Sequence, residues 1–238
     1  MCFSMGNAIR WLKLQISKID IDLPDNEAKS LLCELIDNFI RERVNVADQV
    51  IVGLASDMVQ TGQVILTYAH HHLVERTLLY AKASGKDFDV VVVDDPYERV
   101  GVDHAKTLST AGIPVTYVSD PGAALLSHLA GASIVLVAAE AMFSNGAMYA
   151  RAGTSDITMA APEFGVPVTA LCETINFTER VSIDSLTYNE IDPERCTGEE
   201  FRLLFDTTRS EFITTVVTEL GDSPSRSMPS LLRKLEEL

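Results

Sequence analysis

The stretch Ala139–Ser155 holds the residues of this sequence best suited to binding an anion. Asn145–Gly146 is a turn signal, and Gly153–Ser155 is expected to begin a helix. The free N–H groups of such a helix start attract an anion, and the neighbouring Arg151 guanidinium could hold a phosphate through two hydrogen bonds. The alternative is an ordinary turn and a capped helix, in which Asp156 compensates the helix dipole and would repel an anion. The sequence of this stretch is therefore compatible both with a phosphate site and with an ordinary turn and helix.

Three other groups of residues could carry chemistry, and each also has a simpler structural interpretation. Cys172 and Glu173 could act as a nucleophile and its base, although a buried, inert cysteine is commoner. His70–His72 could ligate a metal only with ligands from elsewhere, since neighbouring side chains of an extended segment point to opposite faces. A loop or helix start is the simpler interpretation, and no metal site is predicted. Asp94–Asp95 could hold a ribose hydroxyl, but capping or a turn before Pro96 explains the pair more simply.

Short apolar runs after residue 63 predict the strands that would position these residues. The runs are β-branched and continuous, as in strands covered on both faces of a parallel sheet. The predicted strands are Val64–Tyr68, Asp89–Val93, Pro114–Val118, Ile134–Ala138, Val166–Leu171 and Arg202–Phe205. The predicted helices are Leu73–Ser84, His104–Ala111, Gly122–Ala130, Ser155–Phe164 and Ser210–Leu220. Left-handed caps are expected after the first four helices, at Gly85, Gly112, Gly131 and Gly165.

This order of elements predicts an α/β fold in which residues 63–238 form a Rossmann-like, doubly wound and mainly parallel sheet. Ligands of such sheets bind at the carboxyl ends of the strands. The loop after the first predicted strand contains no GxGxxG motif, so the cradle for the pyrophosphate of a dinucleotide is missing. No cofactor is therefore predicted.

The first 62 residues predict a separate helical domain. Its first helix carries an apolar stripe whose members are 4, 3, 4 and 3 residues apart: Met5, Ile9, Leu12, Ile16 and Ile19. Pro24 ends that helix, and Asp25 is the expected N-cap of a second apolar series that stops at Gly62. This series is either one long helix or two helices with a bend.

Composition limits the class of protein. Of the 238 residues, 47% are hydrophobic and 22% charged, as in a globular protein, and the net charge is −15. Without a basic run, the chain is not expected to bind nucleic acid by itself, although it can meet a basic protein. Neither a membrane span nor a signal peptide is predicted. The scattered cysteines are expected to be buried and reduced, which points to the cytoplasm: Cys2, Cys33, Cys172 and Cys196.

Six short motifs together carry a resemblance to a known superfamily. They are Ser4–Ile9, Asn145–Gly146, Arg151–Thr154, Cys172–Thr174, Glu179–Val181 and Thr218–Gly221. The chain resembles, over nearly its whole length, the superfamily that joins two kinds of protein. One kind is the isomerases of methylthioribose 1-phosphate and ribose 1,5-bisphosphate. The other is the alpha, beta and delta regulatory subunits of eukaryotic translation initiation factor 2B, of which the delta branch is the most similar.

The resemblance implies that the isomerase chemistry is lost. The isomerases use a cysteine after the first Rossmann strand and an aspartate after the fourth, and these positions correspond to Ala69 and Glu140. Ala150 and Arg151 replace the Asn-Lys pair that helps them grip phosphate. The resemblance leaves a vestigial sugar-phosphate pocket, in which weak binding of a sugar or nucleotide phosphate is conceivable and turnover is not expected. Its residues would be Ala69, Glu140, Asn145, Arg151, Gly153, Thr154 and Cys172.

The resemblance further implies a regulatory role. A delta-like subunit would pair with a beta subunit, join an alpha–beta–delta core and support the gamma and epsilon subunits, of which epsilon exchanges guanine nucleotide on initiation factor 2. Helical domains of the family face the alpha subunit of initiation factor 2, whose phosphorylated form inhibits exchange. Arg41, Glu42 and Arg43 are candidate contacts, although an ordinary solvated helix face explains them equally well.

Two expectations remain open. Delta subunits usually carry a long N-terminal extension, whereas this sequence begins almost at Ser4–Ile9, so contacts made by the extension are expected to be absent. The alternative function is a metabolic protein of the same fold that binds or isomerises a sugar phosphate.

Overall fold

The N-terminal part of the chain is a pair of helices that pack side by side. The computed structural model describes residues 2–119, 122, 124–195 and 201–236. Helix α1 spans Phe3–Lys18 and α2 spans Asp25–Ile40. α2 continues through a π-helical segment, η1 (Arg41–Val46), into α3 (Ala47–Met58), so the second predicted series is one continuous helix. Asp25 is the first residue of α2, and the N-cap position before it is held by Pro24, whose side chain makes no capping hydrogen bond.

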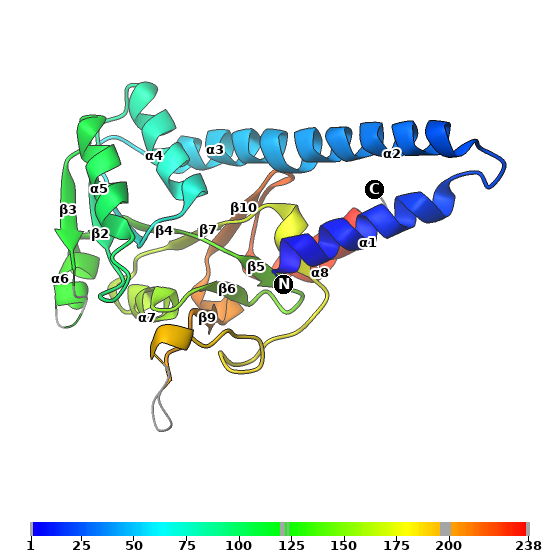
Figure 1. Cartoon of the computed structure of the whole chain (residues 1–238). Coiled ribbons are helices and arrows are strands. Elements are labelled where there is room, and N and C mark those ends of the chain that lie inside the picture. The colour runs from blue at the N-terminus through cyan, green and yellow to red at the C-terminus, as the bar shows by residue number, and fades with distance from the viewer. Residues whose placement is uncertain (1, 120–121, 123, 196–200, 237–238) are drawn as a thin grey trace.

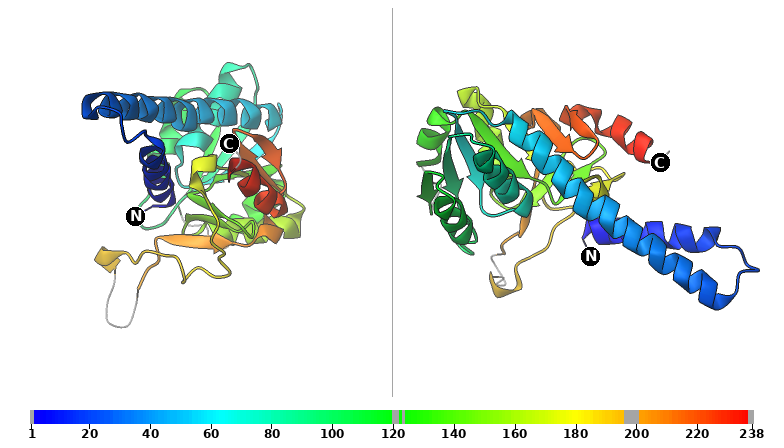
Figure 2. Two further views of the ribbon diagram at one scale, coloured as in Figure 1. Left: turned by 90° about the vertical axis from the view of Figure 1, so that its right-hand side faces the viewer. Right: turned by 90° about the horizontal axis from the view of Figure 1, so that it is seen from above.

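We call residues 3–46, which comprise α1, α2 and η1, the helical arm. The arm extends well beyond the sheet in two views (Figures 1 and 2). No residue of α1, α2 or η1 is fully buried, whereas α3 buries one face, with Ile51, Val52 and Ala55 in the core. The helix is therefore anchored through α3, and its first half remains largely exposed.

The central sheet of the described residues has seven strands in the order β11-β10-β7-β4-β1-β2-β3. All neighbours are parallel except β10 and β11. The strands are β1 (Val64–Tyr68), β2 (Asp89–Val93), β3 (Val115–Val118), β4 (Ile134–Ala138), β7 (Val168–Leu171), β10 (Thr215–Thr218) and β11 (Gly221–Ser223). The parallel strands follow the 3-2-1-4-5-6 order of a Rossmann sheet, which confirms the predicted fold class.

Helices cover both faces of this sheet (Figure 1). One face packs against α3, α4 (His72–Ala83) and α5 (Gly101–Thr110), and the other against α6 (Ala124–Gly131), α7 (Thr154–Ala160) and α8 (Met228–Glu236). Successive strand residues alternate between the two cores, with Ile65 in one and Leu66 in the other. Short helical turns are η2 (Ala161–Phe164), η3 (Thr174–Asn176), η4 (Pro193–Arg195), η5 (Ser210–Phe212) and η6 (Ser225–Ser227).

A second, smaller sheet was not predicted from the sequence. Its order is β8-β5-β6-β9, with β5 (Ala141–Phe143), β6 (Met148–Arg151), β8 (Phe177–Thr178) and β9 (Phe205–Thr208). Phe3 of α1 packs on this sheet, with its ring centroid 5.6 Å from those of Phe143 and Tyr149. The small sheet thus links the start of the helical arm to the loops at the carboxyl end of the main sheet.

Several local predictions are wrong. Ser210–Leu220 is not a helix, because the β-branched run Thr215–Thr218 forms β10 inside the main sheet. The strand predicted at Arg202–Phe205 begins only at Phe205 and belongs to the small sheet. Gly131 is the last residue of α6 and not a left-handed cap.

The expected burial of the cysteines holds for one of them. Cys172 is buried, but Cys2 and Cys33 are exposed, and Cys196 lies outside the described residues. None of the described helices is both long and apolar enough to cross a bilayer. The division of the chain into two domains at residue 62 stays a prediction.

Candidate functional site

A small cavity lies at the carboxyl ends of β1 and β4, where doubly wound sheets bind their ligands. Four predicted site residues line it together: Ala69, Glu140, Arg151 and Thr154. The other lining residues are Tyr68, His70, His71, Val137 and Ala138. We call this space the strand-end cavity. Its volume is about 50 Å³, whereas ligand pockets usually measure about 300–1,000 Å³, so it is too small to enclose a sugar phosphate.

The side chain of Tyr68 occupies the space next to Gly153. The Tyr68 hydroxyl donates a hydrogen bond to the Ala152 carbonyl oxygen at 2.7 Å. A Cβ atom on Gly153 would lie 2.2 Å from that hydroxyl oxygen, and Gly153 has a φ of +103°. Only glycine fits both the conformation and the close approach. The glycine predicted to bind phosphate is therefore used to pack the core against a tyrosine.

The start of α7 already holds an anion supplied by the protein itself. The Asp206 carboxylate, on β9, accepts hydrogen bonds from the backbone N–H groups of Gly153 (2.7 Å) and Ser155 (2.8 Å). Burial raises the pKa of Asp206 to about 6, and the two hydrogen bonds oppose this rise. The predicted phosphate donors are thus occupied by a carboxylate, which no sequence signal had marked.

Arg151, the predicted phosphate clamp, belongs to a network of charges. Its guanidinium lies 2.5 Å from the Glu98 carboxylate and 3.8 Å from that of Asp95. Arg202 pairs with Asp95, with Glu98 at 3.5 Å and with Asp192 at 3.2 Å. We call these five residues the acid–arginine cluster. With three acids for two arginines, the cluster leaves no excess positive charge for a phosphate.

Asp94 is a structural residue. Its Oδ1 accepts hydrogen bonds from the N–H groups of Asp95 and Gly101, both at 2.8 Å, and its Oδ2 accepts one from the Tyr117 hydroxyl at 2.8 Å. Gly101 is the first residue of α5. The capping interpretation of Asp94 is therefore the one that the geometry supports.

Two further predicted site residues do not line the strand-end cavity. Asn145 donates from Nδ2 to the Ser182 carbonyl oxygen at 2.7 Å and stabilises the turn between β5 and β6. Cys172 is completely buried, and burial raises the pKa of its thiol well above the ordinary value. A thiol held in its neutral form is a poor nucleophile.

The histidines meet carboxylates at the edge of a wider cavity of about 440 Å³. His71 caps α4, because its Nδ1 accepts a hydrogen bond from the Leu73 N–H at 3.3 Å. His72 lies 3.5 Å from the Asp48 carboxylate and 3.3 Å from that of Glu173. The hydrogen bond to Glu173 raises the pKa of His72 against the effect of burial. The lining acids Glu140 and Glu173 disfavour an anionic ligand here.

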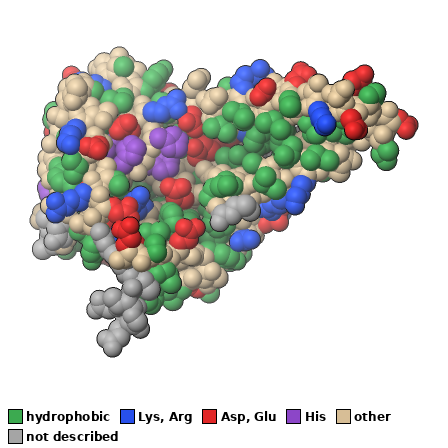
Figure 3. Space-filling view, in the orientation of Figure 1, with side chains coloured by type: hydrophobic (Ala, Val, Ile, Leu, Met, Phe, Trp, Pro, Cys, Tyr) green, Lys and Arg blue, Asp and Glu red, His purple; other side chains and the backbone are tan. Residues whose placement is uncertain are grey.

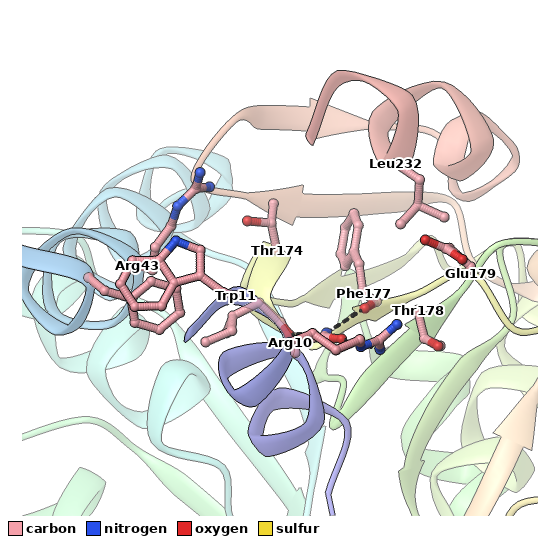
Figure 4. Close-up of a pocket in the computed structure, with 11 residues that line it drawn as sticks. Arg10, Trp11, Arg43, Thr174, Phe177, Thr178, Glu179 and Leu232 are labelled. Atoms are coloured by element: carbon pink, nitrogen blue, oxygen red, sulfur yellow. Dashed lines mark hydrogen bonds between the residues drawn. The ribbon is translucent and has the colours of Figure 1, made fainter. Parts of the chain in front are cut away.

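The candidate partner face lies on the π-helical segment of the arm. Arg41 and Glu42 are exposed and pair with each other at 3.5 Å, while Arg43 is half-buried. Arg43 lies beside Trp11 at one end of a cavity of about 220 Å³ (Figure 4). Trp11 stacks on Phe39 with ring centroids 4.2 Å apart. The cavity separates the arm from the loop before β8 and from α8, so Arg43 is turned toward the body of the protein.

Comparisons with known proteins identify the family. The family model described as "Initiation factor 2 subunit family" matches residues 1–225. The chain belongs to this family. It is 42% identical to the translation initiation factor eIF2B subunit delta of Schizosaccharomyces pombe, over 100% of this chain and 56% of that protein. It is 32% identical to the eIF2B subunit delta of Dictyostelium discoideum, over 97% of this chain and 40% of that protein.

A solved structure of the family shows the same fold. The chain matches one in the tetrameric eIF2B-beta2-delta2 complex from C. thermophilum with a TM-score of 0.89 and 52% identity. That match covers 92% of this chain and 70% of the other. The resemblance found in the sequence is therefore confirmed. The chain spans about half the length of the curated eIF2B delta relatives that it matches.

In this member of the initiation factor 2 subunit family, the first landmark motif has a clear structural role. Asn7, within Ser4–Ile9, donates two hydrogen bonds from Nδ2, to the carbonyl oxygens of Ile175 (2.6 Å) and Phe177 (2.7 Å). These bonds dock α1 on the segment that follows Cys172–Thr174, another landmark. The first motif is thus bonded to the segment that lies between two other motifs, Cys172–Thr174 and Glu179–Val181.

Proposed function

We propose that the chain is a non-catalytic regulatory subunit of the guanine-nucleotide exchange factor for initiation factor 2, of the delta type. The observation that carries this proposal is the match to the delta relatives along all of this chain, at up to 42% identity. In this role the protein pairs with a beta subunit and joins alpha, gamma and epsilon subunits in the cytoplasm. The beta2-delta2 composition of the matched complex supports the pairing with beta.

The strand-end cavity supports the non-enzymatic part of the proposal. At the two positions that carry the isomerases' acid–base chemistry, the chain has Ala69, which cannot transfer a proton, and Glu140. Burial raises the pKa of Glu140, but no thiol lines the cavity beside it within the described residues. Asp206 also occupies the N–H groups that would hold a phosphate. These features oppose the alternative of a sugar-phosphate isomerase.

The exposed apolar surface of the arm supports a role in assembly. Large side chains on α1 and α2 remain open to solvent, including Met5 (57% exposed), Ile16 (51%) and Leu31 (41%). In the space-filling view, hydrophobic side chains gather along the arm (Figure 3). Apolar surface of this kind is typical of a subunit that is covered by partners.

Arg41, Glu42 and Arg43 are the proposed contact to initiation factor 2 and its phosphorylated alpha subunit. Arg41 and Glu42 are accessible, and their mutual ion pair is exposed, so exchanging it for contacts with a partner costs little. Arg43 borders the cavity that contains Trp11, which adds an aromatic surface beside the charges.

The test is reconstitution of the chain with a beta subunit, followed by measurement of binding to phosphorylated initiation factor 2 by biolayer interferometry. We expect a stable complex with beta, and weaker binding of the phosphorylated factor by R41E than by the control K106E. Lys106 is an exposed residue of α5, remote in sequence from the arm. Equal binding by both variants would remove the proposed contact face.

Failure to associate with a beta subunit would reject the assembly role as a whole. A parallel assay with ribose 1,5-bisphosphate tests the alternative function. We expect no turnover, and measurable isomerisation that is abolished by E140Q would establish the metabolic protein instead.

A further inference from the structure

A cluster of two histidines and a glutamate lies on the flank of the main sheet, beside the strand-end cavity that His70 also lines. Glu75, in the first turn of α4, faces His104 of α5, with 3.1 Å between Oε2 and Nδ1. The same Oε2 lies 3.5 Å from Nε2 of His70, in the loop after β1. The three atoms all lie within 4.8 Å of one another. Histidine and acidic side chains adjoin on the face of the molecule shown in Figure 3.

We propose that His70, Glu75 and His104 bind a divalent transition-metal ion, with zinc as the expected occupant. A tetrahedral zinc ion with ligands at about 2.0–2.1 Å holds its ligand atoms about 3.3 Å apart. The distances from Glu75 to the two histidines, 3.1 and 3.5 Å, lie on either side of that value. The two imidazole nitrogens lie within 4.8 Å of each other, and they would approach to about 3.3 Å when both bind the ion.

The chemistry of the three donors selects the kind of metal. Two imidazoles and one carboxylate suit zinc and its first-row neighbours, whereas magnesium and calcium prefer a shell of oxygen ligands. An imidazole binds metal in its neutral form, and burial lowers the pKa of His104. The His70 side chain is 40% exposed, so solvent can supply the fourth ligand.

The backbone and the packing fix these donors in place. Ala69 adopts a φ of +53°, which side-chain-bearing residues rarely adopt, and its N–H donates to the Val93 carbonyl oxygen at 2.7 Å. This turn directs His70 toward α4 and α5. The His104 side chain is completely buried, so its Nδ1 is held against Glu75 by packing. A bound metal would join the loop after β1, α4 and α5.

A neighbouring cluster of Asp48, His72 and Glu173 has similar spacing but is a poorer metal site. The Arg76 guanidinium lies 2.7 Å from the Asp48 carboxylate and already neutralises it. Asn176 also donates to Glu173 at 2.9 Å. A second cation at this place would be repelled by Arg76, whereas no arginine or lysine is paired with Glu75 among the described residues.

The test is isothermal titration of zinc into the full chain, purified without a polyhistidine tag and stripped with a chelator. Cys2, Cys33 and Cys196 are replaced by serine throughout, so that no thiol other than that of the buried Cys172 is present. We expect one zinc site, weakened about 10–100-fold or more in H70A and in E75Q. H128A, outside the cluster, and H72Q, in the neighbouring cluster, are expected to keep it.

Two further readouts separate metal binding from a loss of folding. Cobalt titration should give the visible bands of a tetrahedral ion in the parent protein and in H128A, but not in H70A. Zinc should raise the melting temperature of the parent protein and leave that of H70A unchanged, because only the folded site binds it. No uptake of zinc by the parent, equal affinity in H70A and E75Q, or loss of the site in H72Q with H70A unaffected would each overturn the proposal.

Discussion

The carboxyl end of the main sheet and the helical arm differ in how far their side chains are paired or buried within the protein. At the sheet end, Asp206 fills the start of α7, Tyr68 fills the space beside Gly153, and the acid–arginine cluster balances Arg151. Along the arm, α1 and α2 contain no fully buried residue, and Ile21 between them is 98% exposed. At the sheet end, the polar groups are paired with other groups of the same chain. On the arm, apolar side chains are left exposed to solvent.

Under the proposed function, this difference is what lets a fold that commonly binds small ligands serve in assembly. A sheet end that is closed by its own side chains gains stability but loses room for a substrate. An arm that is anchored at one end presents surface to other molecules at little cost to the core. Four changes test whether the two regions differ in this way.

The largest effect is expected from G153A at the sheet end. The added Cβ would meet the Tyr68 hydroxyl at 2.2 Å, on a backbone with a φ of +103°. We expect the free energy of unfolding to fall by about 3–4 kcal/mol, measured by urea denaturation. G221A is the matched control, because Gly221 has a φ of +112° with no atom near its Cβ position. It should cost about 1 kcal/mol, and equal losses would show that Tyr68 does not close this site.

The second effect concerns Asp206 and pH. Its pKa is raised from 3.8 to about 6 in the folded protein, so between pH 4 and pH 6 the folded state binds more protons than the unfolded state. The stability of the wild type should therefore fall as pH rises through this window. We expect its stability relative to D206N to drop by about 2–3 kcal/mol from pH 4 to pH 7, measured by urea denaturation. A pH-independent difference would mean that Asp206 is charged throughout and not desolvated.

The third effect tests the base of the arm. N7A removes the amide that donates to Ile175 and Phe177, and leaves two carbonyl groups without this partner. We expect a loss of about 1–2 kcal/mol in the free energy of unfolding and faster hydrogen exchange in α1. The control N45A changes an exposed asparagine of η1 and should alter neither quantity. Unchanged exchange in N7A would show that α1 is held by its aromatic contacts alone.

The smallest effect is expected from R41A on the arm. The Arg41 side chain is 65% exposed and pairs only with side chains of its own helix, Asn38 and Glu42, among the described residues. Its removal should change the free energy of unfolding by less than about 0.5 kcal/mol, as judged by thermal melting. A loss above about 1 kcal/mol would mean that this part of the arm stabilises the fold and is not free for partners.

Strong local patterns made most of the fold predictable. The β-branched runs of β1, β2 and β4 and the spaced apolar residues of α1 define their elements without tertiary context. Thr215–Thr218 was harder, because this strand is only four residues long and forms by pairing with the distant β7. The small sheet was also hidden, since β8 is two residues long and is defined by its pairing with β5.

The position of the candidate site was predictable from the sequence, but the hydrogen bonds and ion pairs that its residues make were not. The strand order puts Ala69, Glu140 and Arg151 at one end of the sheet, as expected. Asp206 and Arg202, which satisfy the helix start and the charges, come from a segment far away in the sequence. The local sequence around these residues does not predict their contacts, because the contacts depend on where β9 joins the small sheet.

The π-helical segment η1 determines the direction in which the arm faces. An α-helix turns by about 100° per residue, and a π-helical stretch accommodates one extra residue within the same number of turns. If the residues Arg41–Val46 were wound as a regular α-helix instead, the surface of α2 would be rotated by about 100° about its axis, while α3 stays seated on the sheet. Substitutions that close the widened turn would thus turn the arm to face another direction without disturbing either core, whereas deletion of one residue from η1 would keep its present direction.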